Sequence, residues 1–492
     1  MKRTSQTHPL QIAQVQSDPT FGLIGITFCP GKKQTAAATG AWDRDLKTDI
    51  AAIADWGAAA VVSLIEDHEI EALGVARLEE AVGDAHMLWL HLPIRDVSVP
   101  DGQFETMWTT AGAQLRAILR GGFNVLVHCK GGLGRAGMIA ARLLVELGTD
   151  GGQAISMVRS VRPGAIETCA QLAYVRAAQP AQEPLPDPSL DACQDRALGA
   201  MLGLAVGDAL GTTLEFSARD SRPRLRDMTG GGPFRLAAGQ WTDDTAMALA
   251  LLDSLRSNPR LDETDLMQRF VAWHERGSYS CTGSCFDIGI TTRAALARFK
   301  RSGDPLAGSS DPMSAGNGSL MRLAPVAICH WEDSDRLSEV AARQSRTTHA
   351  APQALDSCVM FAQMLAAAIL GQSRGTVLRA QDICVAEPVA AIMKGSWRAK
   401  HRAQIESSGY VAHSLEAAIW CVARTATFED AVLLAANLGD DADTTAAITG
   451  QLAGALYGAR AIPDVWNSKL AWHDQIVAKT IELFRVGRNA AQ

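Results

Sequence analysis

The sequence predicts an α/β domain with a mostly parallel sheet, followed by an all-helical domain. In the first part, short apolar runs typical of buried strands alternate with helical stretches. The later part is rich in Ala and Leu at helical spacing and has few strand signals. Between the two parts, residues 178–191 carry prolines at 180, 184, 186 and 188, which fit neither a helix interior nor a central strand. We therefore expect domains at residues 1–178 and 193–492, joined by a linker at residues 179–192.

Each expected element follows from such a run. The first domain should contain strands at residues 59–65, 87–94 and 124–128 and helices at residues 43–56, 104–120 and 138–147. In the second domain the helical spacing is clearest at residues 245–255, 354–370, 415–423 and 444–457.

Composition limits the function classes. The chain has 492 residues, a formal charge of −7 and 47% hydrophobic residues, which excludes disorder throughout and argues against a dedicated nucleic-acid binder. The 10 cysteines are spread along the chain and form no dense disulfide framework. Residues 1–19 lack the apolar core of a signal peptide, and no apolar run reaches the roughly 20 residues of a membrane span. We expect a cytoplasmic protein without membrane association.

The first chemical motif is the run NVLVHCKGGLGRAG, which reads as a strand, a glycine-rich loop and a helix start. Gly131, Gly132 and Gly134 allow backbone N–H groups to converge on one point, and the helix presents its positive end there. Arg135 can bind two phosphate oxygens at once. Cys129, at the floor of this anion cradle, should exist as the nucleophilic thiolate.

A thiolate that attacks phosphorus also needs an acid to protonate the leaving alkoxide. Asp96 follows an apolar strand and lies 33 residues before Cys129 (129 − 96). A loop after a neighbouring strand could overhang the cradle, so Asp96 is the candidate acid.

The run HCKGGLGR resembles the signature loop of cysteine-dependent protein phosphatases, nearest to the dual-specificity and cyclin-kinase-associated type. FCPGK at residues 28–32 and VRPGAIET at residues 161–168 also resemble segments of that family, and the likeness covers residues 20–178. The resemblance implies that Cys129 is the nucleophile, Arg135 the phosphate binder and Asp96 the general acid. It also implies that Gln171 helps to place water in the second step.

One position departs from this family. The family usually has Ser or Thr after the arginine, where this chain has Ala136. Because that hydroxyl assists departure of the thiolate from the phospho-cysteine, we expect a burst of product followed by slow turnover. The alternative is that the first domain is a phospho-binding module rather than a phosphatase that turns over.

The second chemical motif is a pair of acidic clusters, WTDDT at residues 241–245 and LGDDADTT at residues 438–445, each before a helix. One cluster alone would be explained by helix capping. Two clusters exceed capping needs, and their charges would repel unless a cation neutralised them. Oxygen ligands favour Mg²⁺ or Mn²⁺ over Zn²⁺, and two such ions could bind vicinal hydroxyls and activate a water.

Three further segments accompany these clusters. The glycines at residues 199–211 allow close helix packing, and Glu215 follows as a free carboxylate. Asn317 and Ser319, in the loop SAGNGSLMR, could hydrogen-bond a sugar or phosphate. The arginines of residues 219–226 are expected to form a solvated face.

Residues 195–483 resemble the ADP-ribosylglycohydrolases, of the bacterial type that reactivates dinitrogenase reductase by removing ADP-ribose from arginine. The motifs are GDALGTTLEF, WTDDTAMAL, GNGSLMR, SGYVAHSLEAAIWC and NLGDDADTTAAITGQLAGALYG. The resemblance implies an all-helical fold with two Mg²⁺ or Mn²⁺ ions. The implied metal ligands are Thr242, Asp243, Asp244, Asp441, Asp443 and Thr444.

The same resemblance implies roles for the remaining motif residues. Glu215 matches the glutamate near the scissile bond, and Asn317, Gly318 and Ser319 match the loop that contacts the distal ribose and phosphates. His349 matches a histidine near the substrate, although a packing histidine explains it equally well. Asp440 stands where the family often has glycine, and its role is open.

Cleavage of a glycosidic bond to ribose passes through a state with positive charge on the sugar, which carboxylates favour. We assign proton handling to Glu215 and Asp244. The sequence thus predicts a bifunctional hydrolase that acts on ADP-ribosylated protein, most simply on arginine, and on phosphorylated protein. A reading of the second domain as a non-catalytic binder is disfavoured because every metal-ligand type is retained.

Overall fold

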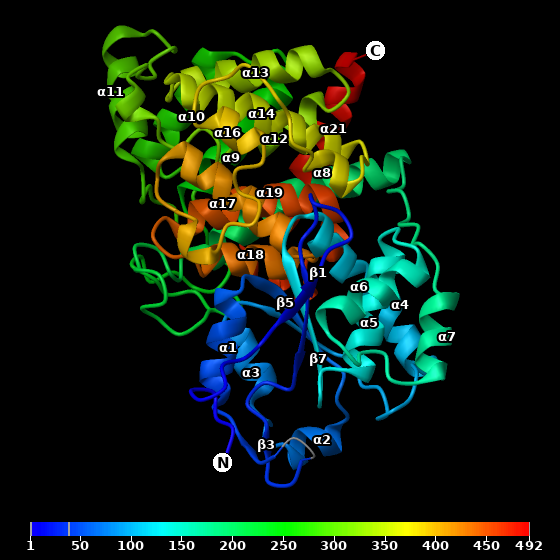
Figure 1. Cartoon of the computed structure of the whole chain (residues 1–492). Helices are drawn as coiled ribbons and strands as arrows, with labels where there is room; N and C mark the ends of the chain where they lie inside the picture. The colour runs from blue at the N-terminus through cyan, green and yellow to red at the C-terminus, as the bar shows by residue number, and fades with distance from the viewer. Residues whose placement is uncertain (1, 38–39, 492) are drawn as a thin grey trace. The chain divides into compact units, whose positions relative to one another are not determined.

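The computed structural model describes residues 2–37 and 40–491. It divides into two compact units (Figure 1). The first comprises Met1–Pro184 with Arg398–His401 and Ala423–Ala426, and the second comprises Leu185–Trp397, Arg402–Val422 and Thr427–Gln492.

The first unit is built on a five-stranded sheet with the order β1-β2-β7-β5-β6. Only β1 runs antiparallel to its neighbour, so the sheet is mostly parallel, as predicted. The central strands β7 and β5 are almost entirely buried, as expected for a parallel sheet covered on both faces. The strands are β1 (Ala13–Val15), β2 (Ile24–Phe28), β5 (Ala58–Ser63), β6 (Leu88–His91) and β7 (Asn124–Cys129), with a separate pair β3 (Lys33–Gln34) and β4 (Trp42–Asp43).

Helices cover both faces of this sheet (Figure 1). Helices α1 and α3 pack against β5 and β6, whereas α4 and α5 pack against β7, with α6 and α7 against α5. Because the carboxyl ends of parallel strands meet at one edge, the segments after β5, β6 and β7 gather there. The helices are α1 (Leu46–Asp55), α2 (Asp67–Ala72), α3 (Leu78–Asp84), α4 (Gly102–Arg120), α5 (Gly134–Glu146), α6 (Gly151–Val161) and α7 (Cys169–Ala177).

The strands β1 and β2 were missing from the predicted set. β1 has only three residues, and β2 contains Gly25, which weakens the strand signal. The structure explains this glycine, because a Cβ there would lie 2.7 Å from side-chain atoms of both Ile12 and Trp56. Packing against those two side chains, rather than strand propensity, determines the residue.

The second unit is helical in its described residues apart from isolated bridges, which confirms the predicted class. Its helices are α8 (Leu190–Gly211), α9 (Asp243–Ser257), α10 (Glu263–Arg276), α11 (Ile290–Ser302), α12 (Ala324–His330), α13 (Ser334–Arg346), α14 (Pro352–Ile369), α15 (Arg374–Val377), α16 (Val389–Met393), α17 (Val411–Arg424), α18 (Phe428–Ala436), α19 (Ala442–Tyr457), α20 (Asp464–Lys469) and α21 (His473–Ala491), with short 3₁₀ turns η1 (Pro312–Ser314), η2 (Arg402–Gln404) and η3 (Ala459–Ala461). Among these, no helix is both long and apolar enough to span a bilayer.

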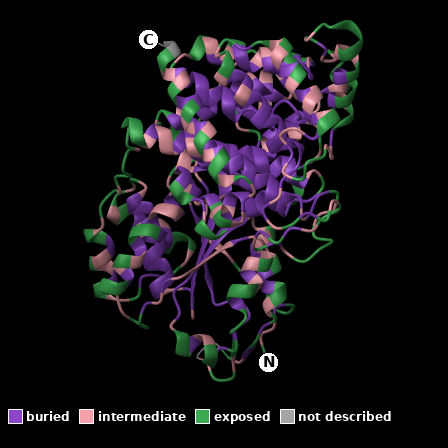
Figure 2. Ribbon diagram, turned by 180° about the vertical axis from the view of Figure 1, so that it is seen from behind, coloured by how far each residue is buried: buried purple, intermediate pink, exposed green. Residues whose placement is uncertain are grey.

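Helices α8 and α19 form the centre of this unit and touch backbone to backbone. A Cβ at Gly203 would lie 2.1 Å from the carbonyl oxygen of Gly450, and one at Gly211 would lie 2.4 Å from that of Ala442. Small residues every four positions on α8 make this approach possible. Both helices are buried along most of their length (Figure 2). The end of α8 is therefore fixed beside the start of α19, where the second acidic cluster lies.

We predict that Gly203→Ala lowers the stability of the second unit by roughly 1–3 kcal/mol, because the added methyl group overpacks the α8–α19 contact. Thermal unfolding followed by calorimetry measures the effect. Gly375→Ala is the control, since an added Cβ on this exposed residue of α15 would meet only Ser373 Oγ, at 3.9 Å. Equal midpoints for the two variants would contradict the packing argument.

Candidate active sites

The loop after β7 closes around the sulfur of Cys129. The Gly132 N–H donates to Cys129 Sγ at 3.3 Å, and the cysteine is only 3% exposed. Gly132 has φ +68°, and a Cβ there would lie 2.4 Å from the Thr27 carbonyl carbon, so only glycine fits. Arg135 follows in the first turn of α5. The predicted sequence of strand, glycine-rich loop and helix is therefore present.

Arg135 is held in place by a carboxylate that sequence reasoning missed. Its Nη1 and Nη2 donate to both oxygens of Glu69, at 2.6 and 3.0 Å, and Nη1 also donates to the Ile94 carbonyl at 2.9 Å. Desolvation raises the pKa of Glu69, but the hydrogen bonds from Arg135 and from the Glu66 N–H outweigh it, so the pKa lies below its ordinary value. Glu69 lies in the short helix α2, where it belongs to a capping box with Glu66, so its sequence context indicates only a helix start.

Asp96 lies at the same edge of the sheet as Arg135. Its Oδ1 is 3.0 Å from Arg135 Nη2, and its side chain is 56% exposed. Gln171 is buried, and its Nε2 donates to the Ser98 carbonyl at 3.1 Å. Gln171 thus ties the segment after Asp96 to helix α7. The structure brings together the candidate acid and the candidate phosphate binder.

Two cations that the sequence analysis did not single out hold the loop from outside. Arg162 donates through Nε to the Gly132 carbonyl at 3.0 Å and through Nη2 to the Gly131 carbonyl at 3.3 Å. Lys32 Nζ donates to the Lys130 carbonyl at 3.3 Å, and burial lowers its pKa to about 8. The carbonyls of three successive loop residues are thus hydrogen-bonded, which fixes the conformation of the loop. The two side chains also place positive charge beside the loop.

The second site begins with Asp208, a buried carboxylate on α8. Thr242 donates to Asp208 Oδ1 through its N–H and its hydroxyl, at 2.8 and 2.9 Å. Thr245 donates to Oδ2 in the same two ways, at 3.0 and 2.7 Å. Asp208 therefore fixes the start of α9, and with it the first acidic cluster. Asp208 lies in the motif GDALGTTLEF, but the sequence predicted no role for it.

The two acidic clusters, about 200 residues apart, meet in one buried place. The Thr242 hydroxyl oxygen lies 3.3 Å from Asp443 Oδ2, and the Thr444 hydroxyl donates to Asp244 Oδ2 at 3.4 Å. Each pair joins one cluster to the other, so the two acidic segments come together in the folded chain.

Glu215 completes this acidic group. Oxygens of Glu215, Asp441 and Asp443 lie within 4.8 Å of one another. Glu215 Oε2 also accepts hydrogen bonds from the N–H groups of Ala442 and Asp443, at 2.7 and 3.1 Å. The start of α19 thus orients the glutamate.

So many buried carboxylates disfavour one another's ionisation. Burial and then the charge of Asp441 raise the pKa of Glu215 to about 8. Burial, followed by neighbouring charges, raises the pKa values of Asp243, Asp244 and Asp443 well above their usual range. Such a concentration of acid is stable in its ionised form only with compensating positive charge.

Asp287 is a further acidic residue at this site, and sequence reasoning missed it. Burial raises its pKa to about 7, with the charges of Asp208 and Asp441 acting in the same direction. It stands alone in the segment CFDIG before α11, in a left-handed backbone conformation with φ 59°. A single acid without a repeated pattern gives no sequence signal.

The donor set fits a hard divalent cation. It consists of carboxylate and hydroxyl oxygens, the ligands that such ions prefer. Asp244 Oδ1 is buried and has no hydrogen-bond partner among the described residues, which leaves a lone pair for a cation. Capping of α9 and α19 does not account for this oxygen, so capping alone does not explain the clusters.

The loop with Asn317 lies against the acidic group. Asn317 Nδ2 donates to Asp441 Oδ2 at 2.6 Å and to Ser414 Oγ at 2.8 Å. A Cβ at Gly318 would lie 2.8 Å from His349 Cε1, so the histidine packs directly under this loop.

Ser319 and His349 themselves are buried. Ser345 donates to Ser319 Oγ at 2.8 Å. His349 Nδ1 lies 2.9 Å from Thr348 Oγ1, and burial, with a smaller effect of Arg322, lowers its pKa to about 3. Ser319 is thus held by Ser345 within the loop, and His349 packs against the loop.

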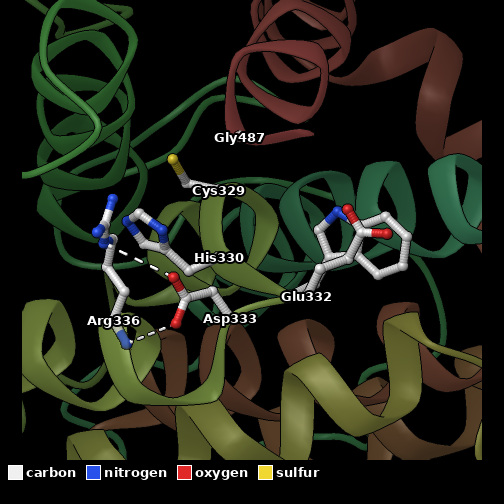
Figure 3. A pocket seen from close by; sticks show the side chains of 7 residues that line it. Cys329, His330, Glu332, Asp333, Arg336 and Gly487 are labelled. Carbon is white, nitrogen blue, oxygen red and sulfur yellow. Dashed lines mark hydrogen bonds and ion pairs between the residues drawn. The ribbon is translucent and has the colours of Figure 1, made fainter. Parts of the chain in front are cut away.

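A separate cavity near the end of α12 has a different character (Figure 3). Arg336 approaches Asp333 twice there, with its N–H donating to Oδ1 at 3.0 Å and its Nε 3.7 Å from Oδ2. The cavity holds only about 10 Å³, room for about one water molecule. These contacts cap α13, and the cavity is too small for a nucleotide.

Known proteins resemble both parts of the chain. Residues 189–491 match the family model for ADP-ribosylglycohydrolase, and residues 41–175 match that for the Swiss Army Knife protein, DSP-PTPase phosphatase domain. The chain is 45% identical to ADP-ribosylarginine hydrolase Tri1 of Pseudomonas putida over 273 residues, 56% of this chain and 73% of the relative.

Two further proteins extend the comparison. ADP-ribosyl-[dinitrogen reductase] glycohydrolase of Rhodospirillum rubrum is 36% identical over 245 residues, covering 50% of this chain and 78% of the relative. A solved ADP-ribosylglycohydrolase-related protein complex is 39% identical, covers 61% of this chain and 100% of its own, and superposes with a TM-score of 0.54. The chain therefore belongs to the ADP-ribosylglycohydrolase family of metal-dependent hydrolases, and it carries a dual-specificity-type phosphatase domain before its glycohydrolase domain.

Proposed function

We propose that the second domain hydrolyses the bond between ADP-ribose and an arginine side chain of a protein. The observation that carries this proposal is the meeting of the two acidic clusters with Glu215 at the α8–α19 contact. The name of the relative at 45% identity, an ADP-ribosylarginine hydrolase, supports arginine as the acceptor.

We further propose two Mg²⁺ or Mn²⁺ ions as the cofactor. The proposed ligands are Thr242, Asp243, Asp244, Asp441, Asp443 and Thr444. The ions would supply positive charge that orients the vicinal ribose hydroxyls and makes a nearby water more acidic. The unpartnered Asp244 Oδ1 and the hard oxygen donor set support this choice.

The protein groups then act on a developing positive charge. As the bond from the anomeric carbon to the guanidine nitrogen breaks, the carboxylates stabilise the positively charged sugar. Water adds its oxygen to the anomeric carbon, and its proton reaches the departing guanidine. Glu215 and Asp244 are the proposed proton carriers. Asn317 positions Asp441, and Gly318, Ser319 and His349 shape the loop proposed to meet the distal ribose and phosphates.

For the first domain we propose cysteine-dependent phosphatase chemistry on phosphorylated protein. Cys129 Sγ attacks phosphorus, Arg135 and the N–H groups around Gly131, Gly132 and Gly134 bind the phosphate oxygens, and Asp96 protonates the leaving oxygen. Ala136 offers no hydroxyl for the second step, and this observation favours phospho-binding as the second candidate function.

The proposed boundaries are residues 1–178 for the phosphatase domain, 179–192 for the linker and 193–492 for the glycohydrolase domain. Helix α8 begins at Leu190, with Ser189 as its N-cap, so it starts inside the proposed linker. Capping by Ser189 gives the physical reason for that start.

Asp441→Asn should reduce Mg²⁺- or Mn²⁺-dependent release of ADP-ribose from ADP-ribosyl-arginine at least a hundredfold, because it removes a proposed ligand charge. Asp440→Asn is the matched control, since Asp440 is exposed and has φ 59°, a conformation that Asn tolerates. Chromatography of the released ADP-ribose, with and without a chelator, measures the activity of both variants. Full activity of the Asp441 variant would refute the ligand set.

Ala136→Ser should speed the second step of phosphatase turnover, because the hydroxyl can assist departure of the thiolate. In stopped-flow assays with an aryl phosphate, we expect an unchanged burst and a steady-state rate raised roughly tenfold, about 1.4 kcal/mol. Cys129→Ser should abolish both phases. Fast steady-state turnover without a burst in the unaltered chain would contradict the proposal that the second step limits the phosphatase rate.

Glu69→Ala should weaken phosphatase activity and destabilise the first unit by about 3 kcal/mol, because it leaves the buried Arg135 guanidinium without its main partner. Arg77→Ala, which removes an exposed ion pair with Glu80, should change little. Thermal unfolding and kcat/KM for an aryl phosphate are measured for both variants. If both variants behave like the unaltered chain, Glu69 does not position Arg135.

A further inference from the structure

The segment after Glu215, SARDSRPRLRDMT, carries four arginines within eight residues. Arg219 is an anchor: its Nε donates to the Leu438 carbonyl at 3.0 Å, and Nη1 donates to that of Arg402 at 2.5 Å. The other three, Arg222, Arg224 and Arg226, line a cavity of about 830 Å³. That volume is in the range of ligand-binding pockets.

This cavity adjoins the proposed glycohydrolase site. Glu215 and Phe216 contribute to its wall. The Phe216 N–H donates to the Asp440 carbonyl, and the Asp440 N–H donates to the Ser217 carbonyl, both at 2.8 Å. The cavity wall is thus locked to the loop that carries Asp441, so an occupant of the cavity would lie beside the acidic group.

The charge of the lining is positive. The lining residues include three arginines and two acidic residues, Glu215 and Asp227. Asp227 accepts hydrogen bonds from Lys469 Nζ at 2.9 Å and from Trp466 Nε1 at 2.7 Å, so its charge is matched by a residue outside the lining. Such a cavity favours an anionic occupant.

An exposed aromatic group adds an apolar contact. Phe216 is 67% exposed and has φ 57°, a left-handed conformation that is unfavourable for a bulky residue. Its ring packs edge-on against Phe234, with the centroids 6.2 Å apart. An exposed phenyl ring beside arginines suits a polypeptide segment, which offers both apolar and charged groups.

We propose that this cavity binds an anionic segment of the target protein, with carboxylate or phosphate side chains next to the ADP-ribosylated arginine. The proposal rests on the proposed function, in which Glu215 lies at the scissile bond and the Asn317 loop meets the nucleotide. The acceptor side of that bond then faces the Glu215 loop. Because Glu215 also lines the arginine-lined cavity, a protein attached through its arginine would lie next to that cavity.

The test compares peptides that carry ADP-ribosyl-arginine flanked by Asp and Glu, by phosphoserine, or by Ser and Gly. For the full chain with Mg²⁺, we expect kcat/KM to be at least tenfold higher for the anionic peptides, mainly through KM. The double variant Arg222→Glu with Arg226→Glu should bring that ratio near one. The control is Arg301→Glu, a charge reversal on an exposed arginine of α11 outside both sites, which should keep the ratio.

A ratio near one in the unaltered chain, or a ratio that the double variant leaves unchanged, overturns the proposal. Equal losses on all peptides give an unchanged ratio and would instead indicate nucleotide binding in the cavity. Fluorescence anisotropy with the same peptides lacking ADP-ribose measures binding without catalysis. Failure to release ADP-ribose from any arginine substrate, with binding still selective for anionic peptides, would refute the proposed function alone.

Discussion

The glycohydrolase site depends on the direct contact of two helix backbones. Helices α8 and α19 approach so closely that Gly199, Gly203, Gly207 and Gly211 leave no room for a Cβ. This contact fixes the end of α8 against the start of α19, and Asp208 extends the arrangement to α9. Side chains about 200 positions apart in the chain then share one buried place. Larger residues at the contact would separate these helices and, with them, the acidic clusters.

The two sites handle buried charge in opposite ways. In the phosphatase domain the cation Arg135 is already paired with Glu69, so its orientation is fixed before a phosphate arrives. In the glycohydrolase domain, acids face acids, and burial followed by the charges of neighbouring acids raises their pKa values. The first arrangement suits an anionic substrate. The second suits cations and a reaction in which the sugar becomes positively charged.

Helix starts contribute to both sites. The anion cradle precedes α5, where the backbone offers positive partial charge, and Arg135 lies in the first turn of that helix. Glu215 accepts hydrogen bonds from the N–H groups at the start of α19, which orients this carboxylate beside Asp441. The same property of helix termini thus serves the proposed phosphate binding in one domain and carboxylate positioning in the other.

The sequence by itself determined the two fold classes, most long helices, the central strands and the residues with local motifs, such as Cys129, Arg135 and the two acidic clusters. These signals lie within short stretches, where spacing and residue type suffice. Only the tertiary structure revealed the contacts of Glu69, Asp208 and Asp287, because each acts through groups that are distant in sequence. Asp208 lies in the motif GDALGTTLEF, but the motif does not identify its partners. The arginines after Glu215 belong to the same class: composition marked them as basic, but the cavity that they line is made by folding.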